Sequence, residues 1–140
     1  MANYGPADIT VEYDNAAASL VDITAHVLTI NDIDVENITE EVRPFGAAWD
    51  THLAIGVGRM PVIEIGGVYD DTASTGPDAL FAGRVPEGPS TNSRTLAVTW
   101  GSTKVTTVET ILLTYRRTAD KNGLTRWTAR LQPTGAVSEA

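Results

Sequence analysis

Residues 95–117 read T-L-A-V-T-W-G-S-T-K-V-T-T-V-E-T-I-L-L-T-Y-R-R, a run in which Val, Ile and Thr dominate. β-Branched residues fit a pleated strand, whereas Gly and Ser favour a turn. We therefore expect a strand over 95–100, a turn at Gly101-Ser102 and a long strand over 104–117.

A second hairpin follows directly in the sequence. Asn122-Gly123 is a strong signal for a tight turn, and it leads to a strand over 124–131. In that strand Trp127, Ala129 and Leu131 alternate with Arg126, Thr128 and Arg130. This alternation predicts that the Trp127 side chain faces the core. We expect residues 132–140 to form a short C-terminal tail.

Three earlier stretches also have strand character. Residues 8–13 and 61–69 are bounded by turn residues, and residues 21–30 are rich in β-branched side chains. Residues 31–35 continue the alternation of residues 21–30, so we expect that strand to extend through residue 35.

Glycine and proline mark two special positions. Gly66-Gly67, within a strand, predicts a bulge or a close approach of another backbone. Farther on, Thr75 or Gly76 can cap a short helix that has Pro77 at its first position.

These patterns predict a mainly β fold: a two-sheet antiparallel sandwich or barrel with one short flanking α-helix. The 140 residues, 42% of them hydrophobic, suffice for a single domain over 1–140. The absence of cysteine excludes a disulfide framework and fits a reducing cytosol. We expect no membrane association, because no stretch approaches the roughly 20 apolar residues of a spanning helix and the N-terminus is unlike a signal peptide.

Residues 45–60 are apolar but have no clean helical or strand period, so we expect a long loop or arm. Large apolar side chains in such a loop would be unusual on a free monomer. The loop is therefore a candidate contact surface between subunits, with the candidate residues Phe45, Trp49, Leu53, Ile55 and Met60.

The net charge of −8 is unevenly distributed. Before residue 82, 14 acidic residues face only Arg43 and Arg59, whereas the rest of the chain has 8 basic and 4 acidic residues. An acidic half and a basic half suit the packing of identical subunits, although uneven solvated charge explains the pattern equally well. Conventional nucleic-acid binding is disfavoured, because it needs clustered Lys and Arg.

Asp32, Asp34 and Glu36 share one side of the alternating segment, and Ile33 and Val35 share the other. This alternation predicts that Ile33 and Val35 lie in the core. The acidic stripe has an ordinary explanation as a solvated strand face. A functional alternative is an acidic surface that repels DNA, because three like charges on one face contribute nothing to folding.

Residues with catalytic potential are few, and we predict no enzymatic activity, no metal and no cofactor. His26 and His52 belong to no cluster with metal-ligand spacing. Asp70-Asp71 lacks the pattern of a calcium loop and fits better as the polar lead-in to the helix. The serines have no His and Asp partners visible in the sequence.

Two longer motifs resemble a known family. F-G-A-A-W-D-T-H-L-A-I-G-V-G-R-M at 45–60 and I-E-I-G-G-V-Y-D-D-T-A-S-T-G-P-D-A-L-F at 63–81 resemble tail tube proteins (major tail proteins) of siphovirus-like phages, which have long non-contractile tails. T-L-A-V-T-W-G-S-T-K at 95–104 and L-Q-P-T-G-A-V-S-E-A at 131–140 are similar to the C-terminal strands and tail of that family. The resemblance covers roughly residues 8–140.

The resemblance implies the tail tube fold and a structural virion protein that is assembled in the host cytoplasm. Subunits of that family form hexameric rings whose sheets join into an inner β-barrel. The rings stack into a hollow tube through which DNA is ejected without specific binding. The implied partners are further copies of the chain, a tape-measure protein, and tail tip or terminator proteins.

The resemblance also suggests roles for the two candidate surfaces. The loop at 45–60 would bridge neighbouring rings, and Asp32, Asp34 and Glu36 would line the lumen.

Other functions remain open at this point. A tail terminator or head–tail joining ring protein can share the same fold. A β-sandwich module could instead bind sugars by stacking them on Trp49, Trp100 and Trp127, but the expected core position of Trp127 weakens this alternative.

Overall fold

The structure is a computed structural model that describes residues 5–85, 93–119 and 121–140. The chain divides into two units. We call residues 1–31 with 62–140 the body, and residues 32–61 the arm.

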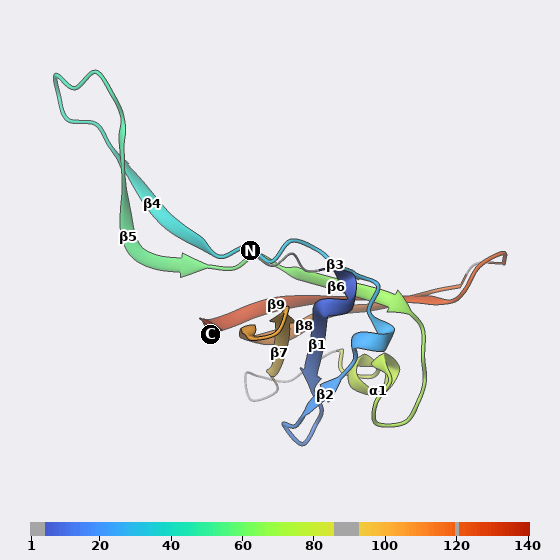
Figure 1. The fold of residues 1–140 in the computed structure, drawn as a ribbon. Coiled ribbons are helices and arrows are strands. Elements are labelled where there is room, and N and C mark those ends of the chain that lie inside the picture. The colour runs from blue at the N-terminus through green and yellow to red at the C-terminus, as the bar shows by residue number, and fades with distance from the viewer. Residues whose placement is uncertain (1–4, 86–92, 120) are drawn as a thin grey trace. The chain divides into compact units, whose positions relative to one another are not determined.

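The body is built on one antiparallel sheet of seven strands in the order β2-β1-β7-β8-β9-β6-β3 (Figure 1). Its strands are β1 (Ile9–Asp14), β2 (Leu20–Asp22), β3 (Thr29–Ile30), β6 (Ile63–Val68), β7 (Arg94–Trp100), β8 (Lys104–Thr118) and β9 (Arg126–Glu139). Its helices are the 3-10 turns η1 (Pro6–Asp8) and η2 (Thr24–His26) and the α-helix α1 (Pro77–Phe81). The arm contains β4 (Glu36–Val42) and β5 (Thr51–Arg59), which form a separate antiparallel pair.

The long pair β8–β9 forms the middle of the body sheet. It pairs from Thr118 opposite Arg126 to Thr106 opposite Glu139. β7 pairs with the first half of β8, and β6 pairs with the first half of β9. The β7–β8 hairpin and the strand after Asn122-Gly123 therefore form as the sequence predicts.

The expected C-terminal tail at 132–140 is wrong, because β9 continues through this segment to Glu139. Ala140 also exchanges two backbone hydrogen bonds with Val105, at 3.0 and 2.9 Å. The segment looks like a tail in the sequence because Pro133 and Gly135 interrupt its strand pattern. Gly135 has a φ of +81° at a bulge against β8, which a glycine tolerates without strain.

The core lies between one face of the sheet and α1. Phe81 is fully buried, and its ring lies 4.8 Å from the ring of Tyr13 and 5.4 Å from that of Trp127. Trp127 is 1% exposed and donates a hydrogen bond from Nε1 to the carbonyl of His26 at 3.1 Å, so its predicted core position is confirmed. The remaining large buried side chains include Val11, Ile23, Ile63, Ile65, Leu80, Leu96, Val98, Leu112 and Leu131.

The short helix α1 begins as the sequence predicts. Gly76 is its N-cap in an extended conformation, and Pro77 follows at the first helical position. Two contacts fix the helix to β8: the hydroxyl of Tyr115 donates to Asp78 at 3.1 Å, and Arg117 lies 3.4 Å from the same carboxylate.

The strand expected over residues 21–35 is wrong, since it is interrupted. The Asp22 carboxylate accepts hydrogen bonds from the backbone N–H of Thr24 at 2.9 Å and from its hydroxyl at 2.6 Å, which turns the chain into η2. Such side-chain bonds compete with strand pairing. Pairing resumes only at β3, after which the Asn31 side chain bonds the backbone of Glu64 and Val62.

Residues 31–35 form no strand, and this removes the basis for placing Ile33 and Val35 in the core. Val35 is 50% exposed and Ile33 is half-buried. The prediction for these two side chains is wrong, because an alternating pattern buries one face only where a neighbouring strand pairs with it.

The predicted fold class is confirmed: the chain is mainly β, with two antiparallel sheets and, in the described residues, one short α-helix. Residues 45–60, expected as a long loop or arm, contain the turn of the arm and the whole of β5.

Gly66 and Gly67 lie where two backbones come close, as predicted. A Cβ at Gly67 would lie 1.9 Å from the carbonyl oxygen of His26, and one at Gly66 would lie 2.8 Å from that of Trp127. Only glycine lets β6 pass this close to the segment after η2.

We predict that Gly67→Ala lowers the free energy of unfolding of the body by at least about 2 kcal/mol, because the backbone must shift to admit a methyl group. Urea denaturation followed by circular dichroism measures this change. Gly5→Ala is the control, since nothing lies within 4 Å of a Cβ there. Equal stability of both variants would contradict the close approach.

Candidate assembly surfaces

The arm is a two-stranded hairpin held by backbone pairing and two ion pairs. Glu36 lies opposite Arg59, with the guanidinium Nε 2.7 Å from the carboxylate. Arg43 and Asp50, on either side of the turn, are 3.4 Å apart. All four side chains are at least 39% exposed, so each pair contributes on the order of 0.2–1 kcal/mol.

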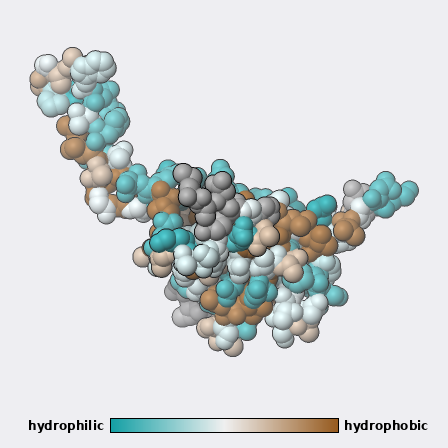
Figure 2. All heavy atoms as spheres, viewed as in Figure 1, coloured by the Kyte–Doolittle hydropathy of each residue, from teal (hydrophilic) through white to brown (hydrophobic). Residues whose placement is uncertain are grey.

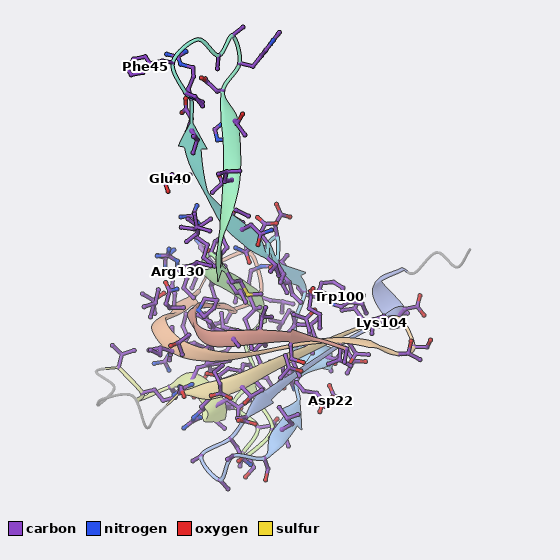
Figure 3. All side chains as sticks on the ribbon, turned by 90° about the vertical axis from the view of Figure 1, so that its left-hand side faces the viewer. Asp22, Glu40, Phe45, Trp100, Lys104 and Arg130 are labelled. Atoms are coloured by element: carbon purple, nitrogen blue, oxygen red, sulfur yellow. The ribbon has the colours of Figure 1, made fainter. Side chains whose placement is uncertain are left out.

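The arm leaves large apolar side chains in contact with solvent. All nine residues of β5 are exposed, including Leu53 at 52% and Ile55 at 50%. At the tip, Phe45 is fully exposed and Trp49 is 84% exposed. Hydrophobic residues are interspersed with hydrophilic ones along the arm in Figure 2, and Phe45 projects outward from its end in Figure 3.

A hairpin of this kind is at best marginally stable in water. Contiguous exposed apolar surface usually marks a contact with another molecule. Four of the candidate contact residues (Phe45, Trp49, Leu53 and Ile55) are exposed, whereas Met60 is half-buried. Their role at a subunit interface stays a prediction.

A bulge explains why the arm has no regular period in the sequence. The register shifts between Asn37 and Thr39, so that Ile55, Gly56 and Val57 together stand opposite one residue of β4. Gly56 has a φ of +80°, and Gly46 in the turn has a φ of +85°. Glycine adopts such positive φ values readily, whereas residues with a Cβ adopt them only at an energetic cost.

The three acidic residues predicted for a channel surface lie in the arm. Asp32 and Asp34 are exposed on the segment before β4, and Glu36 is half-buried at the first position of β4. They do not share the face of one regular strand. Their position in a lumen stays a prediction.

The body presents two partly unpaired strand edges. β7 pairs with β8 only as far as Thr110, so within the described residues the next stretch, 111–118, has β9 as its one strand partner. β6 pairs with β9 only as far as Leu131, so in the same described part residues 132–139 pair with β8 alone. The free edge of β8 points toward the β7 end of the sheet, and that of β9 points toward the β6 end. An open edge can accept a strand from another chain.

The other candidate residues have structural explanations. The hydroxyl and backbone N–H of Thr72 donate to Asp70 and lower the pKa of its carboxyl, and His26 lies 3.6 Å from the same group. His52 is exposed on the arm. In the residues that the structure describes, no group of three His, Cys, Asp or Glu side chains could hold a metal ion.

Tyr115 has a perturbed pKa for a structural reason. Burial raises the pKa of its hydroxyl, and the hydrogen bond to the Asp78 carboxylate adds to the increase. The neutral hydroxyl therefore stays a donor that holds α1 against β8.

The three tryptophans do not form a common platform for a sugar. Trp127 is in the core, and Trp100 is 37% exposed with its Nε1 donating to Thr106 at 2.8 Å. Trp49 lies in the arm, which is a separate unit. Across the described residues, no helix is long and apolar enough to span a bilayer.

No protein-family model and no curated protein matches the chain. Solved structures share its fold. A chain from the tail of the empty gene transfer agent (GTA) particle, computed with helical refinement and C6 symmetry, has a TM-score of 0.78 at 19% identity, with 99% of each chain covered. A chain from the virion of the native GTA particle has a TM-score of 0.75 at 18% identity, again covering 99% of each chain.

A third chain comes from the sixfold-symmetrised baseplate of the anti-feeding prophage (AFP). It has a TM-score of 0.76 at 13% identity, and the match covers 100% of this protein and 97% of that chain. The three matches establish a shared fold over essentially the whole length.

We predict that the arm contributes little to the stability of the isolated body. Leu53→Ala should change the free energy of unfolding of the dissociated protein by no more than about 0.5 kcal/mol, because the residue is 52% exposed and lies on a two-stranded hairpin with no core of its own. Leu131→Ala removes the same atoms from the core and should cost about 2–5 kcal/mol. Urea unfolding of both variants at low protein concentration makes the comparison, and a large loss with Leu53→Ala would show that the arm packs within the monomer.

Proposed function

We propose that this protein is a structural component of a phage-type tail, and specifically the subunit of a tail tube. In this proposal six copies form a ring, rings stack into a hollow tube, and DNA leaves the particle through the tube. The observation that carries the proposal is the arm: a hairpin with exposed apolar side chains along β5 and at its tip gains stability by packing on another subunit.

Ring formation is supported by the two strand edges that are partly unpaired in the described part of the body. The outer edge of β8 over 111–118 and that of β9 over 132–139 face opposite sides of one sheet. A contact between different edges repeats around an axis and closes into a ring when the rotation fits. Closure would also satisfy strand edges that otherwise favour aggregation. The shared fold with chains of sixfold-symmetric tail and baseplate assemblies supports six as the number.

Stacking of rings is assigned to the arm. Phe45, Trp49, Leu53 and Ile55, with Met60 near its base, would leave water by packing on the next ring. At about 25 cal/mol per Å² of apolar surface, such burial repeated six times per ring gives a large driving force. The tape-measure protein and the tail tip or terminator proteins would set where stacking begins and ends.

The channel surface is assigned to Asp32, Asp34 and Glu36. Carboxylates repel DNA phosphates, so an acidic lumen lets the duplex slide without binding.

We predict that deletion of Ala47–Gly58 abolishes tube formation, because the deletion removes most of β5 and the tip aromatic Trp49. Negative-stain electron microscopy of the assembled protein gives the result. Leu20→Ser is a control, since it removes an exposed apolar side chain, 46% accessible, from the body. Full-length tubes formed without residues 47–58 would refute the assignment of the arm.

The same images separate a tail tube subunit from a tail terminator or head–tail joining protein. Filaments of stacked rings support the tube. Isolated rings that never stack at any concentration would favour the terminator or joining role.

We predict that the double substitution Asp32→Lys with Asp34→Lys leaves tube assembly intact but slows DNA ejection, because cationic side chains in the channel would bind phosphates. The rate of DNA release from particles that carry the variant measures the effect. It should also become strongly dependent on salt concentration. Ejection at the normal rate at low salt would place these residues outside the lumen.

A further inference from the structure

An open groove in the body runs beside the second half of β8. Its volume is about 310 Å³, and its walls include Phe81, Val85, Leu113, Tyr115 and Arg117. At about 30 Å³ for a water in the bulk liquid, this is space for on the order of ten waters, and so for an aromatic side chain.

The groove has an apolar wall that faces solvent. Val85 is 55% exposed and Leu113 is 40% exposed. Leu113 stands out from the sheet because the register of β8 against β9 shifts between Leu112 and Thr114. The bulge therefore presents an apolar side chain that a regular strand would not.

One wall of the groove is suited to a further aromatic ring. The Arg117 guanidinium lies 5.5 Å from the centroid of the Tyr115 ring, and its Nη1 is 3.4 Å from the Asp78 carboxylate. The Tyr115 and Phe81 rings are stacked at 5.7 Å. An incoming ring can pack against the half-buried Tyr115 ring, which the buried Phe81 supports from behind, while Arg117 supplies a cation at the border.

The arm and the surroundings of the groove carry opposite charge. Residues 32–61 contain six carboxylates and two arginines, so their net charge is −4. Residues 111–131, which include the wall of the groove formed by β8, contain five basic residues and one acidic residue, so their net charge is +4. Opposite potentials favour docking and fix its direction.

We infer that the aromatic tip of the arm, Phe45 and Trp49, of one copy occupies this groove on another copy. The inference rests on the proposed function, because it names the receiving surface for the arm between rings. It matches the two exposed aromatic side chains at the tip of the arm, 109% and 84% accessible, with a groove that has aromatic and apolar walls and lies beside a positively charged segment.

A second groove in the body fits the arm less well. Its volume is about 260 Å³, and Trp100, Lys104 and Glu139 contribute to its walls. The carboxylate of Glu139 offsets the charge of Lys104, and the indole N–H of Trp100 is already bonded to Thr106. Each groove has one cation balanced by a carboxylate, Arg117 by Asp78 and Lys104 by Glu139, so the two grooves differ in the net charge of +4 that residues 111–131 place around the first.

Cysteine cross-linking tests the inference directly, because the chain has no native cysteine. One population carries Trp49→Cys, and a second carries Leu113→Cys. The two populations are mixed, assembled, and oxidised with a copper–phenanthroline catalyst in air. We expect a disulfide-linked dimer on a non-reducing gel from the assembled mixture, and none from either population alone, because a disulfide needs Cα atoms within about 7 Å.

Two controls make the result specific. Lys104→Cys replaces Leu113→Cys to probe the second groove, and Phe45→Cys replaces Trp49→Cys to probe the other tip residue. All the replaced side chains are exposed, so the fold should persist, which circular dichroism checks. Cross-links to Lys104→Cys in place of Leu113→Cys would overturn the inference.

Electron microscopy of the same samples separates the inference from the proposed function. If tubes assemble but neither tip cysteine cross-links to Leu113→Cys, the inference is overturned while the proposed function as a tail tube subunit stands. The unsubstituted protein is imaged beside them, because the tip substitutions can themselves weaken stacking. If the unsubstituted protein forms neither rings nor tubes, even with the other proteins of the particle, the proposed function is overturned and the inference with it.

Discussion

The pairing of β8 with β9 is the interaction on which the body depends. It is the longest ladder in the molecule, and it carries Leu112 opposite Leu131 and Trp127 opposite Arg117. Every other strand of the sheet is added to one side of this pair or the other. Because β7 covers only one half of β8 and β6 only one half of β9, the same ladder that organises the core also leaves two edges incompletely paired among residues 5–85, 93–119 and 121–140. Stability and the capacity to associate thus arise from one element.

The arm shows the opposite balance between packing and exposure. Its two strands satisfy their backbone groups, but neither face of β5 is buried, and the two ion pairs at its ends are solvent-accessible. Two paired strands cannot bury enough apolar surface to offset the conformational entropy of ordering them. The exposed Phe45, Trp49, Leu53 and Ile55 make sense as a surface whose packing partner belongs to another molecule.

Charge gives this arrangement a direction. The arm has a net charge of −4 and residues 111–131 of the body have a net charge of +4, so two copies attract each other where the arm of one meets this part of the other. A contact between unlike surfaces can repeat without limit along an axis, whereas a contact between like surfaces stops at a dimer. Both the proposed tube and the proposed binding of the arm in the groove beside Leu113 depend on this difference in charge between the arm and residues 111–131.

The sequence by itself determined the strands at 95–100 and 104–117, the hairpin at Asn122-Gly123, the helix start at Gly76-Pro77 and the buried position of Trp127. Each depends on local preferences: β-branched composition, turn chemistry, capping and alternation. It also singled out the apolar residues of the arm. Only the tertiary structure decided the rest.

The Asp22–Thr24 turn interrupts an apparently continuous strand, and pairing with β8 makes a strand of the supposed C-terminal tail. The groove beside Leu113 depends on a bulge and on the approach of α1. The physical reason is common to all three: which face of a segment is buried, and whether it is a strand at all, depends on partners distant in the sequence.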